Sequence, residues 1–490
     1  MEDIKILSDL FKKKYGFLPA GVSRLPGAGS GRKYYRFSGG KEVCIGVAGE
    51  NLRDCRAFVK LSNVFRGAGI PVPEVYEVSR DEMHYIQEDL GDTSLFSIIQ
   101  SDSASCSAND DANDSPDDAT AALVSSSMKL LAAMQCTDKK RWESCVEYSP
   151  FSIRQVFWDL NYFKYEFLKP SGTDFDEEAL ENDFESLAER IISSCGEASG
   201  FMFRDFQSRN VMVKNGECYF IDFQGGRLGP SLYDAVSFLW QAKAGFSDDF
   251  RYRMLEIYAR EYEKVKNIPA ESIVRDAPLF ALFRTLQVLG AYGLRGLVEK
   301  KAHFLESIPK ALQNLSGLIK NGALDSYPEL KRVSERLIAD ERFIIKSKKE
   351  YLTIKVFSFS YKKGYPADYS GNGGGFMFDC RGMHNPGRYQ EYKTLTGLDQ
   401  PVIDFLKEKG ETDLFSDRAY ELVSPTVERY VKRGFNSLQI GFGCTGGQHR
   451  SVYCAEAVAK MLADRFPMAV VEVCHREQGI EKVYNLIEGR

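Results

Sequence analysis

The sequence predicts two domains: an α+β domain over residues 1–325 and an α/β domain with a parallel sheet over residues 351–490. The first domain opens with short strand patterns between glycine clusters and continues with long helical periods. The second domain alternates strand and helix patterns, which is typical of a parallel sheet. The 490 residues and the hydrophobic content of 43% are enough to build two cores.

Composition argues against several classes of protein. A net charge of −5 gives no global signal for nucleic acid or an anionic membrane surface. The eleven cysteines contain no CxxC pair and no disulfide-framework spacing. The start "MEDIKILSDLFKKKYG" indicates an amphipathic helix rather than a signal peptide, and no run of about 18 apolar residues predicts a membrane span. We therefore expect a cytoplasmic protein with free thiols and no membrane partner.

The elements of the first domain follow in order. After the first helix, "GVSRLPGAGSGRKYYRFSGGKEVCIGVAG" predicts three strands joined by glycine-containing turns. A helix is expected near 52–66, and "GIPVPEVYEV" and "MHYIQEDLG" predict two more strands. Residues 101–118 are polar, acidic and small, so we expect a disordered surface insertion. Helical periods fill about 120–200 and about 231–320.

The boundary between the domains is a charged segment. Residues 326–350 predict a helical linker that ends in basic residues. A new strand pattern opens at "YLTIKVFSFSY", and the second domain continues through "SLQIGFGCTGGQHRSV" to "AVVEVCHRE".

Three polar residues near the middle of the chain have the spacing of a phosphoryl-transfer site. They lie in "FRDFQSRNVMV" at 203–213 and "YFIDFQGG" at 219–226. Such a site needs a carboxylate that accepts the proton of the attacking hydroxyl, together with Mg²⁺ ligands. Asp205 and Asn210 lie five residues apart, and Asp222 follows a predicted hairpin with an Asn-Gly turn. The hairpin is expected to bring Asn210 and Asp222 to the same edge.

Residues 1–320 resemble the aminoglycoside phosphotransferase/choline kinase family, which has a bilobal, protein-kinase-like fold. "RDFQSRN" and "IDFQGGRLGPSLYD" are similar to its catalytic and metal-binding segments, in particular those of the anomeric N-acetylmuramate/N-acetylglucosamine kinases of cell-wall recycling. The resemblance implies ATP and Mg²⁺ as cofactors and an amino sugar as substrate. It implies Asp205 as catalytic base, Asn210 and Asp222 as Mg²⁺ ligands, and Asp234 as a buried brace. The cofactor-binding residues that it implies are Gly29, Ser30, Arg32, Lys33, Gln87 and Asp89.

The sequence departs from this family at two positions. Phe203 occupies the place of a histidine two residues before the base, and Gly46 lies about where a phosphate-pairing lysine is expected on the third strand. A non-catalytic metabolite sensor with a degenerate kinase domain therefore remains the alternative to an active kinase. Candidate substrate contacts, chosen by proximity in sequence, are Arg204, Gln207, Arg209, Gln224 and Arg227.

The second domain contains a predicted anion-binding loop. "SLQIGFGCTGGQHRSV" at 437–452 indicates a strand, a glycine-containing loop and a helix start, where loop amides can hold a phosphate. Cys444 and Arg450 also have the C-x5-R spacing of cysteine-dependent phosphatases, which leaves that chemistry as an alternative.

Residues 351–490 resemble the C-terminal domain of the RNase adapter protein RapZ, through "DCRGMHNPGRY", "LTGLDQPVIDFL", "IGFGCTGGQHRSVYCAE" and "CHRE". The resemblance implies a phosphosugar site and hints at self-association. The implied site residues are Arg381, Asn385, Thr445, Gly446, Gly447, His449, Arg450 and Ser451. A family histidine is replaced by Gly387, and His384 lies three residues earlier. RNA is not an expected partner, because residues 351–490 carry 18 Lys and Arg against 17 Asp and Glu.

Overall fold

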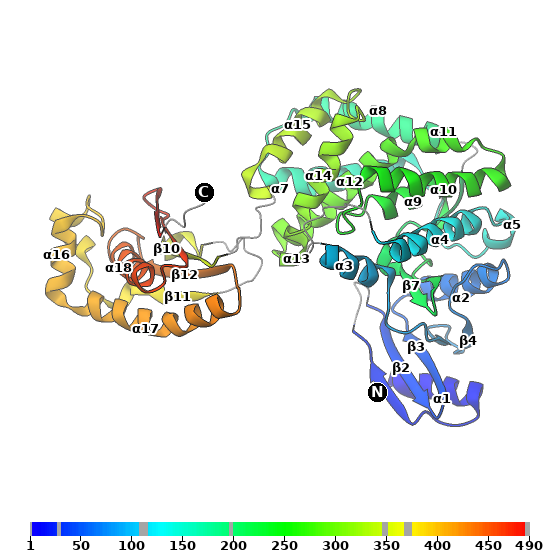
Figure 1. Ribbon diagram of the computed structural model, residues 1–490, viewed down its shortest axis with the longest axis horizontal. Coiled ribbons are helices and arrows are strands. Elements are labelled where there is room, and N and C mark those ends of the chain that lie inside the picture. The colour runs from blue at the N-terminus through cyan, green and yellow to red at the C-terminus, as the bar shows by residue number, and fades with distance from the viewer. Residues whose placement is uncertain are drawn as a thin grey trace. The chain divides into compact units, whose positions relative to one another are not determined.

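The computed structural model describes residues 2–26, 31–106, 116–195, 199–344, 351–366 and 375–485. The chain divides into two compact units (Figure 1). The first comprises Met1–Glu299 and Ser307–Ile344, and the second comprises Lys300–Glu306 and Ile345–Arg490.

The first unit begins with a five-stranded antiparallel sheet in the order β1-β2-β3-β5-β4. Its strands are β1 Gly21–Arg24, β2 Lys33–Gly39, β3 Glu42–Ala48, β4 Val75–Val78 and β5 His84–Glu88. Helix α1 (Glu2–Tyr15) covers one face, where Leu7 and Phe11 pack with Phe37 and Cys44 (Figure 1). Because side chains alternate along a strand, odd-numbered residues of β2 face α1 and even-numbered ones face away from it.

The rest of the first unit is mainly helical, with two small two-stranded antiparallel sheets. One sheet pairs β6 Ser199–Met202 with β9 Arg227–Pro230, and the other is the hairpin of β7 Val211–Lys214 and β8 Glu217–Phe220. The helices are α2 Leu52–Arg66, α3 Leu95–Cys106, α4 Asp118–Gln135, α5 Lys139–Trp142, α6 Ile153–Phe163, α7 Lys169–Ser171, α8 Glu177–Cys195, α9 Leu232–Leu239, α10 Asp248–Lys266, α11 Ala270–Arg275, α12 Ala277–Tyr292, α14 Ile308–Lys320 and α15 Pro328–Ala339.

Two boundaries differ from the sequence-based expectation. The first unit extends to Ile344, beyond residue 325, because α15 packs on α14 and α8 instead of forming a free linker. Residues 101–106 continue α3, and Asp117 caps α4 by accepting a hydrogen bond of 2.6 Å from the Thr120 N–H. The expected disorder over 101–118 is therefore wrong at both ends, and residues 107–115 lie outside the described residues.

One helical stretch, Ala270–Val298, is long and apolar enough to cross a membrane by composition. It contains α12, and 67% of its most apolar window is buried inside the protein. We therefore interpret it as a core helix of the first unit.

The second unit contains a mixed five-stranded sheet in the order β11-β12-β10-β13-β14. Strands β11 Phe376–Asp379, β12 Ser437–Cys444, β10 Thr353–Ser360 and β13 Val470–His475 are parallel. The predicted parallel sheet is thus confirmed, with the addition of an antiparallel edge strand, β14 Ile480–Tyr484. Its long helices are α16 Gln400–Lys409, α17 Glu411–Lys432 and α18 Arg450–Arg465 (Figure 1). The short α13 Ala302–Leu305 is also assigned to this unit.

Candidate active site

A buried carboxylate holds the loop that carries Asp205. Asp234, in the first turn of α9, accepts hydrogen bonds from the backbone N–H groups of Phe203 (2.6 Å) and Arg204 (2.9 Å). It also accepts a bond of 2.8 Å from Gln135 Nε2. Burial raises the pKa of Asp234 to about 7, against the opposing effect of these donors. The backbone immediately before Asp205 is therefore fixed at two successive amides.

Asp205, Asn210 and Asp222 lie in one hydrogen-bonded arrangement. Asn210 Nδ2 donates to the Asp205 carbonyl at 2.8 Å, and the Ile221 N–H donates to the Asn210 carbonyl at 3.0 Å. The second bond extends the β7–β8 hairpin, whose turn places Asn215 and Gly216 in the left-handed region (φ 54° and 81°). The hairpin therefore brings Asn210 beside the residue that precedes Asp222.

The backbone is strained at the same place. Asp222 has φ 68° and Arg204 has φ 79°, in the left-handed region that non-glycine residues seldom adopt. Such conformations cost about 1–3 kcal/mol and cluster at functional sites. Arg204 directly precedes Asp205, and Asp222 is itself a metal-ligand candidate, which supports this region as the active site.

The Asp205 carboxylate is accessible and surrounded by donors. It is 42% exposed, and Gln207 Nε2 donates to its Oδ1. Arg284 Nη2 lies 3.8 Å from the same oxygen, and Arg209 Nη2 lies 3.5 Å from Oδ2. These contacts orient the carboxylate while leaving it open to a substrate hydroxyl.

The donor set around Asp222 fits Mg²⁺. Burial raises the pKa of Asp222, while the Gln224 hydrogen bond (2.7 Å) and the Arg32 charge act in the opposite direction. A cation bound there would favour the ionised carboxylate. Asn210 adds an amide oxygen, and Mg²⁺ commonly combines one or two protein ligands with phosphate oxygens. Among the described residues no group of three or more His, Cys, Asp or Glu forms a metal site, so the fit depends on this pair.

Arg32 supplies a positive charge on the side of the sheet opposite α1. Its Nη1 lies 3.4 Å from Asp222 Oδ1, its Nη2 lies 3.8 Å from Asp54 Oδ2 on α2, and its side chain is 9% exposed. A Cβ built on Gly46 would lie 2.5 Å from Phe37 and 3.1 Å from Leu7. Position 46 therefore faces α1, where a lysine side chain would point away from Asp222, and Arg32 is the cation that contacts Asp222.

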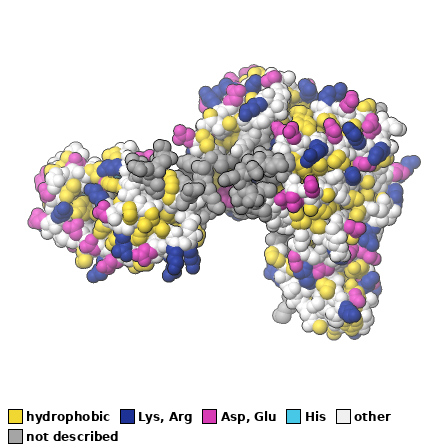
Figure 2. Space-filling model, in the orientation of Figure 1, with side chains coloured by type: hydrophobic (Ala, Val, Ile, Leu, Met, Phe, Trp, Pro, Cys, Tyr) yellow, Lys and Arg dark blue, Asp and Glu magenta, His cyan; other side chains and the backbone are white. Residues whose placement is uncertain are grey.

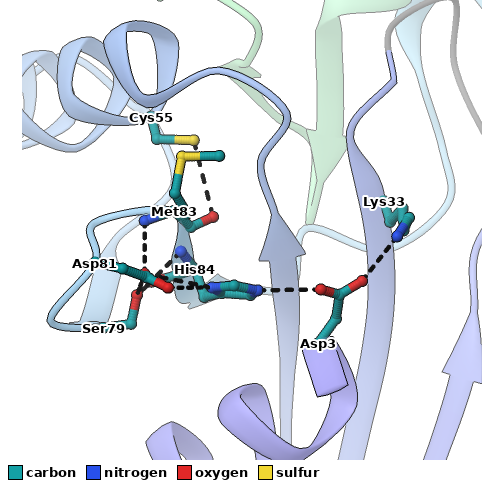
Figure 3. Close-up of polar contacts among 7 residues, drawn as sticks. All are labelled: Asp3, Lys33, Cys55, Ser79, Asp81, Met83 and His84. Carbon is teal, nitrogen blue, oxygen red and sulfur yellow. Dashed lines mark hydrogen bonds and ion pairs between the residues drawn. The ribbon is translucent and has the colours of Figure 1, made fainter. Parts of the chain in front are cut away.

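Lys33 has a different role from the one expected. Its Nζ donates to Asp3 Oδ2 of α1 at 2.9 Å, and Asp3 Oδ1 lies 3.2 Å from His84 Nε2 (Figure 3). His84 continues the network to Asp81, which accepts from the Ser79 hydroxyl (Figure 3). The interpretation of Lys33 as cofactor-binding is corrected, because strand alternation directs it to the α1 face. Gly29 and Ser30 lie outside the described residues.

The segment that contains the expected cofactor-binding residues Gln87 and Asp89 is held from both sides. Asp89 binds Arg36 of β2 through both carboxylate oxygens (2.6 and 3.1 Å). Lys214, at the end of β7, donates to Glu88 Oε1 at 2.8 Å and to the Asp89 carbonyl at 3.0 Å. Gln87 is buried, and its Oε1 accepts no hydrogen bond within the described part of the chain. The Asp89 side chain thus anchors the segment.

Sequence reasoning missed three residues beside the catalytic loop: Asp159 of α6, Tyr233 of α9 and Arg284 of α12. Asp159 Oδ2 accepts from Arg204 Nη2 at 2.6 Å, and Arg284 Nη1 donates to the Tyr233 hydroxyl at 3.2 Å. A charged residue within the apolar run "APLFALFRTLQVLG" was the one available signal for Arg284, because arginine is seldom buried without a partner.

The glycine loop of the second unit wraps around Cys444. The Gly447 N–H donates to its sulfur at 3.2 Å, and Ser451 Oγ lies 3.2 Å from it. Burial alone would raise the pKa of the Cys444 thiol, but hydrogen bonds from Ser451, Gln448 and Gly447 lower it. The thiol is 3% exposed, which does not favour the phosphatase alternative.

Three of the expected anion-binding side chains point into the protein instead. Arg450 Nη1 donates to the carbonyls of Arg381 (2.9 Å) and Met383 (2.8 Å). His449 Nε2 lies 2.9 Å from the Tyr392 carbonyl, and Ser451 is fully buried. Neighbouring turns and Cys444 thus engage Arg450 Nη1, His449 Nε2 and Ser451 Oγ, whereas Arg450 Nε has no hydrogen-bond partner in the described structure, so contact of these side chains with an anion stays a prediction.

The surface of this loop retains a smaller set of anion-binding candidates. Thr445 and Gly446 are exposed. Arg381 is 51% exposed, with its guanidinium 4.2 Å from the Tyr361 ring centre and its Nη2 2.6 Å from Asp379 Oδ2. Asn385 Oδ1 accepts from the Gly387 N–H at 3.2 Å. His384, three residues before Gly387, has its Nδ1 2.8 Å from Glu411 Oε2.

Comparisons with known proteins match both units separately. The phosphotransferase enzyme family matches residues 22–268, and the RapZ C-terminal domain matches residues 352–479. A nucleotide-binding protein of Lactobacillus helveticus is 34% identical over 166 residues, which cover 34% of this chain and 52% of that protein. One from Staphylococcus epidermidis is 32% identical over 202 residues, covering 40% and 61%. The chain spans about half the length of the curated relatives it matches.

Two solved structures are similar to this chain at low sequence identity. A putative aminoglycoside phosphotransferase from Ralstonia eutropha is 14% identical and covers 68% of this chain and 98% of its own, with a TM-score of 0.44. Choline kinase from Cryptosporidium parvum is 13% identical and covers 64% and 93%, with a TM-score of 0.44.

Proposed function

The chain belongs to the phosphotransferase enzyme family, and from that premise we propose that it is an ATP- and Mg²⁺-dependent kinase of an amino sugar. The acceptor is of the N-acetylmuramate or N-acetylglucosamine type. The observation that carries the proposal is the joint arrangement of Asp205, Asn210 and Asp222 beside the Asp234 brace. When bound, Mg²⁺-ATP supplies the phosphoryl group and offsets the charge on its oxygens.

The side chains divide the work of the transfer. Asp205 orients the attacking sugar hydroxyl and accepts its proton, for which its exposed carboxylate is suited. Asn210 and Asp222 hold Mg²⁺ through oxygen atoms. Arg32 neutralises phosphate charge in the place of the missing strand lysine, and its contact with Asp54 ties that charge to α2. Asp234 keeps the catalytic loop in register through backbone bonds.

Two features that could indicate a degenerate kinase are accommodated by the packing. Phe203 contributes a backbone N–H to Asp234, and its ring packs with Phe206 (5.3 Å between centroids) and Phe223 (6.2 Å). Position 46, where the family has a phosphate-pairing lysine, faces α1 in this protein, and Arg32 supplies the positive charge instead. A non-catalytic sensor is therefore the less supported alternative.

A coupled assay of ADP release tests the proposal. The full chain with Mg²⁺-ATP is offered N-acetylmuramate, N-acetylglucosamine or glucosamine. We expect sugar-dependent ADP release that EDTA and the Asp205→Asn substitution abolish, whereas Asp249→Asn on the exposed start of α10 retains it. Absence of release with every sugar would favour the sensor.

The second unit is proposed to bind a phosphosugar or phosphate through the loop at 445–447. Exposed Thr445 and Gly446 and the half-exposed Arg381 support this proposal. RNA is a poorer ligand for the second unit, because acidic and basic side chains are interspersed over the face of this unit that Figure 2 shows. Calorimetric titration of the full chain with glucosamine-6-phosphate and with inorganic phosphate tests it, and no heat with either would contradict it.

A further inference from the structure

Three arginines gather beside the catalytic loop of the first unit, and we call them the arginine cluster: Arg204, Arg227 and Arg284. Arg204 lies one residue before Asp205, Arg227 begins β9, and Arg284 lies on α12 with its Nη2 3.8 Å from Asp205 Oδ1. The aromatic rings of Tyr233 and Tyr148 line the cluster. The Tyr233 ring centre is 5.2 Å from Arg204 Cζ and 5.8 Å from Arg284 Cζ, and the Tyr148 ring centre is 4.9 Å from Arg227 Cζ.

Positive charge is in excess within the arginine cluster. Asp159 pairs with Arg204 at 2.6 Å, and Asp205 is the other carboxylate in ion-pair range, at 3.8 Å from Arg284. Within the described part of the chain, the contacts of the Arg227 guanidinium are the Gly225 carbonyl (3.4 Å) and the Tyr148 ring. Burial lowers the pKa of Arg227, and the charge of Arg204 lowers it further. A second anion beside Arg227 would relieve this repulsion.

Donors in the arginine cluster also lack acceptors. Arg204 Nη1, Arg227 Nε and Arg284 Nε are buried without a hydrogen-bond partner in the described structure. Arg227 and Arg284 are 9% and 8% exposed. One unpaired Nε is not diagnostic, because Arg251 has one as well. Arg251, however, pairs with Asp248 (2.9 Å) and Asn314 (2.7 Å), so it combines an unpaired donor with a balanced charge.

We infer that the sugar phosphorylated by this enzyme carries an anionic group, a carboxylate or a phosphate ester, which the arginine cluster binds. The inference rests on the proposed kinase function and narrows its substrate class. Guanidinium groups present paired N–H donors that match carboxylate and phosphate oxygens. The position of Arg284 beside Asp205 puts such a group next to the reacting hydroxyl. Neutral sugars leave these donors unpaired, and a cationic amino sugar adds repulsion.

The experiment compares sugars that share one ring but differ in charge. N-acetylmuramate carries a carboxylate, N-acetylglucosamine 6-phosphate a phosphate, N-acetylglucosamine no charge and glucosamine a positive charge. For the wild-type full chain, we expect kcat/KM for at least one anionic sugar to exceed that for the neutral sugar by about 10–100-fold. The carboxylate and phosphate arms identify which anion is preferred. Equal or better use of the neutral sugar would overturn the inference while leaving the kinase function intact.

Substitutions test whether the arginine cluster causes the preference for anionic sugars. Arg227→Gln should lower the ratio of kcat/KM for the anionic over the neutral sugar by about tenfold or more. Arg251→Gln is the matched control, since it removes a buried arginine that also has an unpaired Nε, and it should leave that ratio unchanged. If the arginine cluster instead holds the transferred phosphoryl group, Arg227→Gln should lower kcat/KM equally for the anionic and the neutral sugar. That outcome would overturn the inference.

A binding measurement separates failure of the inference from failure of the kinase function. Trp142, Trp158 and Trp240 all lie in the first unit, so tryptophan fluorescence reports binding there and not in the second unit. Suppose that no sugar causes ADP release, that an anionic sugar quenches or shifts this fluorescence, and that Arg227→Gln removes the change. The anion site is then supported and the kinase function is contradicted. If the neutral sugar binds as tightly as the anionic ones, the inference fails.

Discussion

Two buried polar clusters, one in each unit, differ in how completely they are paired. In the second unit, Glu456 of α18 accepts from His475 Nε2 at 3.0 Å, from Lys482 Nζ and from the Tyr484 hydroxyl at 2.6 Å. His475 Nδ1 lies 2.9 Å from Ser358 Oγ. One carboxylate thus joins α18 to β13 and β14, and its partners are all supplied by the protein.

The arginine cluster of the first unit has the opposite character. Buried donors on Arg204, Arg227 and Arg284 lack partners in the described structure, and few carboxylates oppose them. A buried polar group without a partner costs free energy, so a protein retains it where a ligand completes the bonding. The comparison supports our inference that the unpaired cluster binds substrate, whereas the paired network joins α18 to β13 and β14.

The largest expected effect comes from Asp205, the proposed catalytic residue beside the arginine cluster of the first unit. Asp205→Asn removes the proton acceptor but keeps the shape of the side chain, so kcat should fall about 10²–10⁴-fold. The melting temperature should change little, because Asp205 is 42% exposed and Asp234 holds the loop through backbone groups. Steady-state ADP release and thermal melts measure the two quantities. Unchanged kcat would remove Asp205 from the mechanism.

Arg32 provides the next test. Arg32→Ala should lower kcat/KM for ATP by about 100-fold, because its charge contacts Asp222 and Asp54 at the phosphate side of the site. Arg32→Lys should restore part of the loss, since it keeps the charge but not the planar fork. Lys33→Ala is the matched control on the α1 face and should leave KM for ATP unchanged. Equal effects of the Arg32 and Lys33 changes would contradict the assignment of faces.

The paired network of the second unit predicts a change in stability. Burial alone would raise the pKa of Glu456, but hydrogen bonds from His475, Lys482 and Tyr484 lower it from 4.5 to about 2. The carboxylate therefore contributes about 2–3 kcal/mol above pH 4.5, and this contribution is lost as pH falls toward 2. Glu456→Gln should lower the stability of the second unit by about 2 kcal/mol at pH 7. It should also remove the dependence of that stability on pH between about 4.5 and 2.

Hydrogen exchange of the amides of β10 and α18 measures this effect in the full chain. Tryptophan fluorescence, which reports on the first unit, provides the control and should follow the same pH course in wild type and variant. If the Glu456→Gln variant keeps the wild-type protection of both β10 and α18, the Glu456 network is not important for stability.

The arrangement of Asp205, Asn210 and Asp222 could be predicted because their spacing is local. Asp205 and Asn210 share one loop, and an Asn-Gly turn determines where Asp222 returns. Arg284 could not be predicted in the same way, because it lies 79 residues after Asp205 on a helix whose packing brings it back. No local pattern specifies such a contact between distant segments.

Neighbouring residues show where sequence reasoning about side-chain direction is weakest. Arg32 and Lys33 both read as cations of a glycine-rich hairpin, but one contacts Asp222 and the other Asp3. A register difference of one residue in a strand reverses the face. Arg450 similarly lies in a well-predicted loop, yet its side chain bonds the carbonyls of residues 381 and 383. Backbone motifs were predictable, whereas side-chain partners depended on tertiary packing.

The smallest expected effect sharpens the comparison at the loop of the second unit. Gly447 has φ 67°, and an added Cβ would lie 2.4 Å from Glu477 Cγ and 2.8 Å from the Ser360 nitrogen. Gly446 has open space at the same position. Gly447→Ala should therefore distort the loop and weaken binding of glucosamine-6-phosphate or phosphate about tenfold in calorimetric titration, whereas Gly446→Ala should have little effect. Equal affinities for the two variants would mean that the geometry of this loop does not determine anion binding, so the ligand site of the second unit would have to be sought elsewhere.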